Sequence, residues 1–457
     1  MADPSAEQAA MLAQMQARSQ PEWFPDAKLG IFVHWTAATV PAFAPLTDDP
    51  FTLGREHGWE YAIANSPYVE WYQNSLAIEG SPVQRHHAEH WPGVNYDDFV
   101  ARFVEANEHW QPEAWGDLFA SAGARYVVFV TKHHDGVTLW PSRTPNPHKA
   151  AWSTRRDCVS ELAAEVRTRG LRFGVYYSGG LDWTFGGLPM TSVGTMIAAI
   201  PQTEEYCAYA DAHWRELIEL VDPDVLWNDI AYPSKANPFR LFADFYRAKP
   251  DGVVNDRFDV FGVQAGTAHA DFVTPEYSSA EDTPTRMFEV TRGIGRSFGY
   301  NAWEGEADYL DPDELVRMFV DIVARGGNLL LNVGPTATGE IPTAQARRLQ
   351  ALGWWLAVNG EAIYATRPWT RVAGTTADGH DVRYTSSGER VFAIVLGTPP
   401  TREVELDLRP ATGATVRVLG DRVDADWVPT DRGCRVTLPV PLAPAPAHTF
   451  AVDRVAG

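Results

Sequence analysis

The sequence predicts an α/β protein, a TIM-like (β/α)8 barrel followed by a C-terminal antiparallel β-sandwich. Short apolar runs alternate with helical stretches from residue 29 onward, which is typical of a parallel sheet buried on both faces. After Trp369 the chain changes to short alternating runs separated by Gly, Pro and Asp turns, as expected for a sandwich. A length of 457 residues also favours two domains over one.

Each barrel strand is assigned to one apolar run. The runs cover residues 29–35, 126–132, 171–178, 225–229, 252–257, 271–276 and 327–333, with a weaker eighth run (SFGYN) at 297–301. Stretches such as 157–169 and 311–324 carry helical periodicity. Seven or eight such repeats favour a closed barrel over an open doubly wound sheet. We therefore expect an N-terminal helical extension (1–20), a β/α barrel (21–369) that carries the active site, and a β-sandwich (370–457).

Composition and charge exclude several classes of partner. A net charge of −21 opposes nucleic acids and anionic membranes, and no run of 18 apolar residues predicts a membrane-spanning helix. The first residues lack the basic and apolar regions of a secretory signal. Three cysteines without C-x-x-C spacing fit a reducing compartment, so we expect a cytoplasmic protein. Only five of the 38 basic residues are Lys, which is associated with GC-rich bacterial genomes.

The apolar runs share one feature, because each ends at or beside a side chain that can bind or react. These side chains are His34, His133, Tyr177, Asp229, Arg257, Glu276 and Asn332. In a parallel barrel the carboxyl ends of all strands meet at one mouth. The sequence therefore predicts one site assembled from residues about 300 positions apart.

Two acidic residues are the candidates for glycosidic bond cleavage. Asp229 closes the apolar run VLWND, where a carboxylate is costly unless it is paired; a helix N-cap or a metal ligand are its alternative roles. Glycoside hydrolysis requires a second carboxyl group, and Glu276 in DFVTPEY supplies one, unless it only pairs with a nearby arginine. Glu289, expected on a loop beyond a strand, is the alternative acid/base.

Histidines at the strand ends are candidates for binding sugar hydroxyl groups. His133 and His134 precede the Asp135-Gly136 turn, which can direct both rings toward the mouth. A structural role is the alternative for each histidine. The 17 tryptophans fit either a large core or a sugar-binding cleft.

The segment 86–90 (HHAEH) matches a zinc-peptidase motif. It lies between Pro82 and Pro92 in what we expect to be a loop, where helical presentation of two histidines is difficult. We therefore do not expect a metal site at this segment.

Several segments together resemble glycoside hydrolase family 29, the α-L-fucosidases. They are WFPDAKLGIFVHW, EWY, AGARYVVFVTKHHDGVTLWPS, RFGVYYS, VLWND, NDR, GGNLLLNVGP and LGWWLAVNGEAIYATRPW, in order between about Pro21 and Trp369. The resemblance implies a retaining exo-α-L-fucosidase without a cofactor, with Asp229 as nucleophile and Glu276 as acid/base. It implies contacts to fucose from His34, Glu70, Trp71, His133, His134, Tyr177, Trp227 and Arg257.

Two features depart from the family pattern. Phe298 is expected to meet the fucose methyl group where many members have Trp, and the segment 186–201 is unusual enough to suggest a lid or an oligomer contact. A barrel glycosidase for another sugar, such as α-L-galactose, and a non-catalytic fucose-binding protein remain the alternatives. The expected partner is a fucosylated oligosaccharide or glycoconjugate, and self-association is compatible with the sequence. The preferred linkage is left open.

Overall fold

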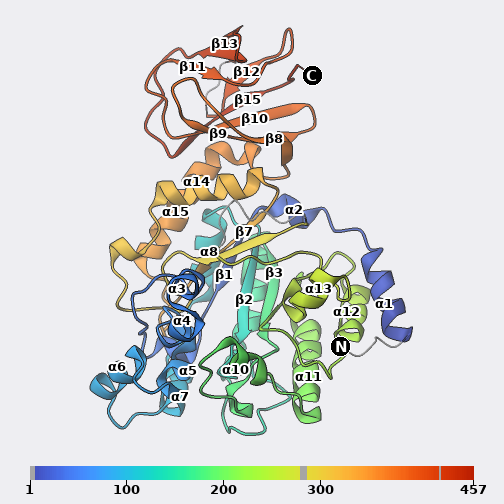
Figure 1. The fold of residues 1–457 in the computed structure, drawn as a ribbon, viewed down its shortest axis with the longest axis vertical. Helices are drawn as coiled ribbons and strands as arrows, with labels where there is room; N and C mark the ends of the chain where they lie inside the picture. The colour runs from blue at the N-terminus through green and yellow to red at the C-terminus, as the bar shows by residue number, and fades with distance from the viewer. Residues whose placement is uncertain (1–5, 278–285, 421–423, 457) are drawn as a thin grey trace.

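In the computed structural model, which describes residues 6–277, 286–420 and 424–456, a parallel sheet is surrounded by helices and followed by an antiparallel domain (Figure 1). The parallel sheet has the order β5-β4-β3-β2-β1-β7-β6. Its strands are β1 (Leu29–Val33), β2 (Tyr126–Lys132), β3 (Arg172–Ser178), β4 (Val225–Asp229), β5 (Val253–Val254), β6 (Glu289–Gly293) and β7 (Asn328–Val333). Between β5 and β6, residues 272–276 form single parallel bridges to both sides and close the ring. The predicted barrel class is confirmed.

The strands are apolar throughout because both of their faces are buried. Every residue of β1, β2, β4 and β7 is buried, and successive side chains alternate between the barrel interior and the layer of helices. In β3, Tyr176 joins Phe32 and Trp227 in the interior, whereas Tyr177 packs with Trp214 toward the helices.

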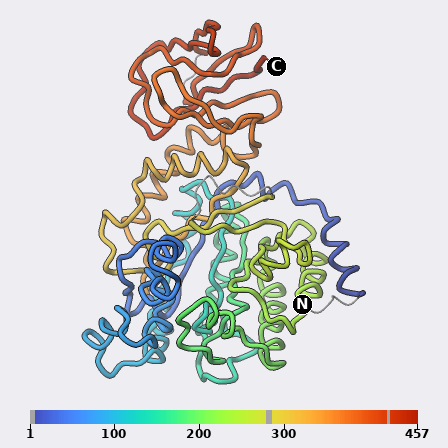
Figure 2. Tube along the Cα trace, viewed as in Figure 1, coloured from blue at the N-terminus to red at the C-terminus, as the bar shows by residue number. Residues whose placement is uncertain are grey.

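Helices cover the outside of the ring and extend its loops. They are α1 (Ala6–Gln16), α2 (Trp23–Ala27), α3 (Pro50–His57), α4 (Trp59–Ala64), α5 (Tyr72–Ala77), α6 (Pro82–His90), α7 (Tyr96–Ala106), α8 (Pro112–Ser121), α9 (Cys158–Thr168), α10 (Val193–Ala198), α11 (Glu204–Val221), α12 (Pro238–Ala248), α13 (Val260–Ala265), α14 (Pro312–Ala324) and α15 (Thr343–Asn359). Helix α1 lies beside α12 (Figure 2), where Arg240 forms an ion pair of 2.9 Å with Glu7. No helix in the described part of the chain is both long and apolar enough to cross a bilayer.

The C-terminal domain is an antiparallel β-sandwich with its own core. Its strands are β8 (Arg367–Thr375), β9 (Asp381–Ser387), β10 (Arg390–Leu396), β11 (Glu403–Leu406), β12 (Val416–Val418), β13 (Asp424–Pro429), β14 (Cys434–Thr437) and β15 (Ala447–Val452). Tyr384, Val391 and Phe450 belong to this core. The sandwich packs on α14 and lies at the end of the barrel opposite α10 (Figure 1).

The structure corrects two local predictions. Residues 297–301 form a loop, and the strand that the sequence analysis missed is β6, which begins at Glu289. The HHAEH segment belongs to helix α6, because Ser81 caps its N-terminus and Pro82 occupies the first turn, where proline is favourable. His86 stacks on Phe43 with ring centroids 3.7 Å apart. No cluster that could hold a metal occurs among residues 6–277, 286–420 and 424–456.

Candidate active site

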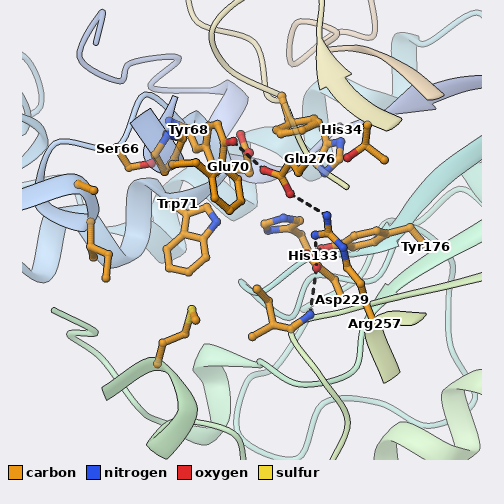
Figure 3. Close-up of a pocket in the computed structure, with 18 of the residues that line it drawn as sticks. His34, Ser66, Tyr68, Glu70, Trp71, His133, Tyr176, Asp229, Arg257 and Glu276 are labelled. Carbon is orange, nitrogen blue, oxygen red and sulfur yellow. Dashed lines mark hydrogen bonds and ion pairs between the residues drawn. The ribbon is translucent and has the colours of Figure 1, made fainter. Parts of the chain in front are cut away.

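The carboxyl ends of the strands meet at a cavity of about 380 Å³ (Figure 3). The inner part of the cavity contains nine of the predicted site residues. They are His34, Glu70, Trp71, His133, Trp227, Asp229, Arg257, Glu276 and Phe298. The expected convergence at one mouth therefore occurs, with side chains supplied by β4, by His34 directly after β1, and by the loops after several strands.

One arginine joins the two central carboxylates. Arg257 Nη1 donates to Asp229 Oδ1 at 2.9 Å, and Arg257 Nη2 donates to Glu276 Oε2 at 2.8 Å, as the dashed lines in Figure 3 show. Burial alone would lower the pKa of Arg257, but its two anionic partners outweigh that effect and raise it. Because both bonds come from one planar guanidinium group, the carboxylates face the same small space, although β5 separates their two segments in the ring.

Asp229 is the last residue of β4, and its carboxylate is held by three donors. Besides Arg257, the backbone N–H of Ile230 donates to Oδ1 at 3.0 Å and the Tyr176 hydroxyl donates to Oδ2 at 2.8 Å. These bonds compensate the burial of a side chain that is only 11% exposed. Asp229 does not cap the next helix, because the N-cap of α12 is Asn237.

Glu276 ends the bridged segment between β5 and β6. The Tyr68 hydroxyl donates to its Oε1 at 2.7 Å, while Oε2 accepts from Arg257. Burial, followed by the charge of Glu276, raises the pKa of Tyr68 well above its usual value. Tyr68 therefore acts as a hydrogen-bond donor that orients this carboxylate.

The histidines of the cavity are neutral imidazoles. Burial lowers the pKa of His34 to about 4 and that of His133 well below 6.5. His34 Nδ1 donates to Asn332 Oδ1 at 2.7 Å, which leaves Nε2 as an acceptor. His133 stacks parallel to Tyr176, with centroids 5.7 Å apart. Its Nδ1 is buried and has no hydrogen-bond partner in the described part of the chain.

Glu70 is a third carboxyl group beside the cavity. Its Oε2 accepts from the backbone N–H of Gly299 at 2.8 Å and lies 3.3 Å from the Ser297 hydroxyl. Burial raises the pKa of Glu70 to about 7, although these hydrogen bonds oppose the rise. Near neutral pH this group can therefore donate or accept a hydrogen bond.

An apolar wall faces the histidines. Phe298 lies 4.9 Å from His34 and 5.3 Å from Tyr68, measured between ring centroids. It is buried, and its loop is held by Asn332, whose side-chain amide donates to the Phe298 carbonyl at 2.7 Å.

Three predicted residues take other positions. Tyr177 points away from the cavity and is hydrogen-bonded to His213 at 3.1 Å. Its neighbour Tyr176 faces inward, because successive side chains of a strand point to opposite faces of the sheet. His134 lies behind the cavity lining, with Nδ1 2.7 Å from Ser178 Oγ and Nε2 4.0 Å from Asp229 Oδ2.

Glu289 is the third residue, and it does not line the cavity. It is the first residue of β6, so it lies inside the barrel at the end where strands begin. It accepts hydrogen bonds from Tyr126 and from Trp227 Nε1, the latter at 3.0 Å. Burial raises the pKa of Glu289 to about 7. This carboxyl group supports the indole that forms the floor of the site.

Tyr68 and Tyr176 are site residues that were not among those predicted from the sequence. Side chains two residues apart on a strand point to the same face, so Trp227 shares the face of Asp229. The register pairs Trp227 with Tyr176 on the neighbouring strand, which places Tyr176 on that face as well. Tyr68 carried no signal, because it belongs to a loop far from the strand ends.

A pair of carboxyl groups at the mouth of a β/α barrel, set around a cavity with neutral imidazoles, defines a glycoside hydrolase. The comparisons with known proteins give the family. The alpha-L-fucosidase family model matches residues 2–361. This chain belongs to that family, glycoside hydrolase family 29, as its resemblance indicated.

Named relatives agree along nearly the whole chain. The tissue alpha-L-fucosidase of Bos taurus is 34% identical over 95% of this chain and 88% of its own length, and the human tissue enzyme is 32% identical with the same coverage. A crystal structure of Thermotoga maritima alpha-fucosidase in complex with a mechanism-based inhibitor has 38% identity and a TM-score of 0.85. That match covers 97% of this chain and 99% of the other.

Proposed function

We propose that this retaining exo-α-L-fucosidase uses Asp229 as its nucleophile and Glu276 as its acid/base. The observation that carries the assignment is the Arg257 bridge, because it joins two carboxylates from different segments of the ring at one cavity. Retaining glycosidases need their carboxyl groups about 5–5.5 Å apart. Two oxygens bound to one guanidinium group are compatible with that separation.

The reaction proceeds in two displacements. Asp229 attacks the anomeric carbon and forms an ester, while the bond to the leaving oxygen breaks and Glu276 gives that oxygen a proton. Glu276 then removes a proton from water, which attacks the same carbon and releases Asp229 as a carboxylate. The sugar leaves with its original anomeric configuration.

Recognition of fucose is supported by two kinds of lining. Two residues that line the cavity have buried polar atoms without a hydrogen-bond partner among the described residues: Nδ1 of His133 and the hydroxyl of Thr291. Buried polar atoms are normally hydrogen-bonded, so these two favour a ligand with polar groups. Phe298 supplies an apolar surface that suits a methyl group at C5. An α-L-galactoside would place a hydroxyl group there without a partner.

A non-catalytic fucose-binding protein is the less supported alternative. Binding alone requires neither a carboxylate with three donors nor a second carboxylate beside it. Burying the two carboxylates costs free energy, and a catalytic role explains why the site contains them.

The nucleophile is tested by Asp229→Gly. We expect loss of activity on an aryl α-L-fucoside with an unchanged circular dichroism spectrum, and partial rescue by azide or formate. Asn237→Gly, which changes a polar residue outside the cavity, is the control. Full activity in Asp229→Gly would refute the assignment.

The acid/base is tested through the leaving group. Glu276→Ala should slow the release of a sugar alcohol far more than that of nitrophenolate, because only the alcohol requires protonation. Equal losses on both substrates would point to a different acid.

We also propose a bacterial source, a cytoplasmic location and fucosylated oligosaccharides or glycoconjugates as substrates. The scarcity of Lys supports the first, and the free thiols of Cys158, Cys207 and Cys434 support the second. Cell fractionation with an antibody tests the location, and light scattering tests self-association.

A further inference from the structure

Besides the carboxylates and histidines, the same cavity is lined by a group of apolar residues, and we call the part that they line the outer cavity. Its lining comes from α3, α4, α10 and the residue after β4. These residues are Pro50, Phe51, Trp59, Ala62, Ile63, Val193, Met196 and Ile230. None of them is charged, and the indole N–H of Trp59 is the polar group among them. Ser66, which follows α4, adds one hydroxyl group to the lining of the cavity.

The α3–α4 wall presents its aromatic rings to solvent. Trp59 is 43% exposed and Phe51 is 37% exposed, and their rings meet edge to face with centroids 5.9 Å apart. Gly54 allows the close contact, because a Cβ there would lie 3.0 Å from the Trp59 ring. Asp49 caps α3 by accepting from the N–H groups of Phe51 and Thr52. The wall is therefore preformed.

Helix α10, which lies within the unusual segment 186–201, supplies Val193 and Met196 to the lining. Met196 packs on a small apolar cluster that includes Trp183 and Met190, and Ile230 and Trp71 border the same cluster. Ser192 and Thr195 form a capping box that fixes the start of α10. A flexible Met side chain in the same lining as two aromatic rings adapts to apolar ligands of varied shape.

The residues of the outer cavity line the same cavity as Asp229 and Glu276, so this part is available to the group that leaves with the glycosidic oxygen. Binding is favoured when an apolar ligand removes exposed apolar surface of this kind from water. A polar oligosaccharide would lose hydration there and find few partners. We propose that the outer cavity is a subsite for apolar aglycones, so that the enzyme prefers alkyl or aryl α-L-fucosides over fucosides of polar sugars. This inference rests on the proposed catalytic function.

The test uses n-alkyl α-L-fucosides from ethyl to octyl, whose leaving alcohols are of similar acidity. We expect kcat/KM for fucose release to rise about threefold to fourfold per methylene until the chain leaves the outer cavity. Trp59→Ala and Met196→Ala should each flatten this dependence, so that kcat/KM falls more for octyl fucoside than for ethyl fucoside. Trp354→Ala is the matched control, since Trp354 on α15 is also exposed, at 73%, and lies outside the cavity.

A second measurement does not require turnover. Calorimetric affinity for N-alkylated iminosugar analogues of fucose should rise with chain length and lose that dependence in Trp59→Ala and Met196→Ala. The proposal is overturned if rate and affinity are independent of chain length, if both variants keep the wild-type dependence, or if fucosyl disaccharides outcompete octyl fucoside. Loss of turnover on every fucoside, with chain-length-dependent binding intact, would instead contradict the proposed function.

Discussion

The adjacent tyrosines at the end of β3 allow a sharp test of the nucleophile assignment. Tyr176 donates to Asp229 Oδ2 at 2.8 Å, whereas Tyr177 is bonded to His213 on the other side of the sheet. Tyr176→Phe removes a donor from the carboxylate and leaves the ring stacking in place. The donor stabilises a free carboxylate more than an ester, so its loss should slow the second displacement, in which the carboxylate is released.

The size of the effect follows from the charge on the acceptor. A hydrogen bond to a charged group contributes about 1.5–3 kcal/mol and one to a neutral group about 0.5–1.5 kcal/mol. The difference of about 1–1.5 kcal/mol corresponds to a roughly 5-fold to 12-fold fall in kcat.

Stopped-flow hydrolysis of a nitrophenyl α-L-fucoside measures this step. Tyr176→Phe should release a burst of nitrophenolate followed by slow turnover, with a fucosyl-enzyme detected by intact mass. Tyr177→Phe should give no burst and lose only about 0.5–1.5 kcal/mol of stability. An unchanged kcat without a burst in Tyr176→Phe, or the same loss in both variants, would refute the reasoning.

Three further predictions concern specificity, pH and stability. Phe298→Asn should reduce the preference for an α-L-fucoside over the α-L-galactoside, because one methyl group in an apolar pocket provides about 10-fold to 200-fold discrimination; kcat/KM on both substrates measures it. Glu289→Gln should keep its activity on poor leaving groups. Because burial raises the pKa of Glu289 from 4.5 to about 7, the folded protein retains a proton that the unfolded chain releases, so wild-type stability should fall relative to Glu289→Gln by up to about 3 kcal/mol between pH 4.5 and 7; urea unfolding at several pH values measures it. Asp182→Asn should lower the free energy of unfolding in urea by about 3–5 kcal/mol, because Lys132, which is buried 3.0 Å from Asp182, loses its ionic partner.

Each of these predictions has a contradicting outcome. An unchanged sugar preference in Phe298→Asn would place the C5 substituent elsewhere. Loss of activity on poor leaving groups in Glu289→Gln would restore that residue as the acid/base, and parallel pH profiles would mean that Glu289 is ionised in the folded protein. Asn146→Ala, at a part-buried loop position, is the stability control for Asp182→Asn, and an equal loss in both would argue against a special role for the buried pair.

The sequence by itself determined the fold class, the strands with continuous apolar runs and the family. It also located Asp229, Glu276 and Arg257, because strand order alone brings the carboxyl ends of parallel strands together. Periodicity is a local property, so long runs such as 126–132 and 225–229 could be assigned without knowing their neighbours. Short elements could not be assigned in this way, because residues 297–301 and β6 have little hydrophobic pattern of their own. Residues 297–301 were therefore predicted to be a strand, and β6 was not predicted.

Tertiary structure decided which side of each strand faces the cavity and what surrounds the carboxylates. The choice of Tyr176 over Tyr177 depends on register, and the position of Glu289 depends on where β6 begins. Tyr68 and the walls from α3, α4 and α10 approach the site from loops whose paths are set by packing rather than by periodicity. Side-chain direction and long-range contact are properties of the closed barrel, and for that reason no local pattern encoded them.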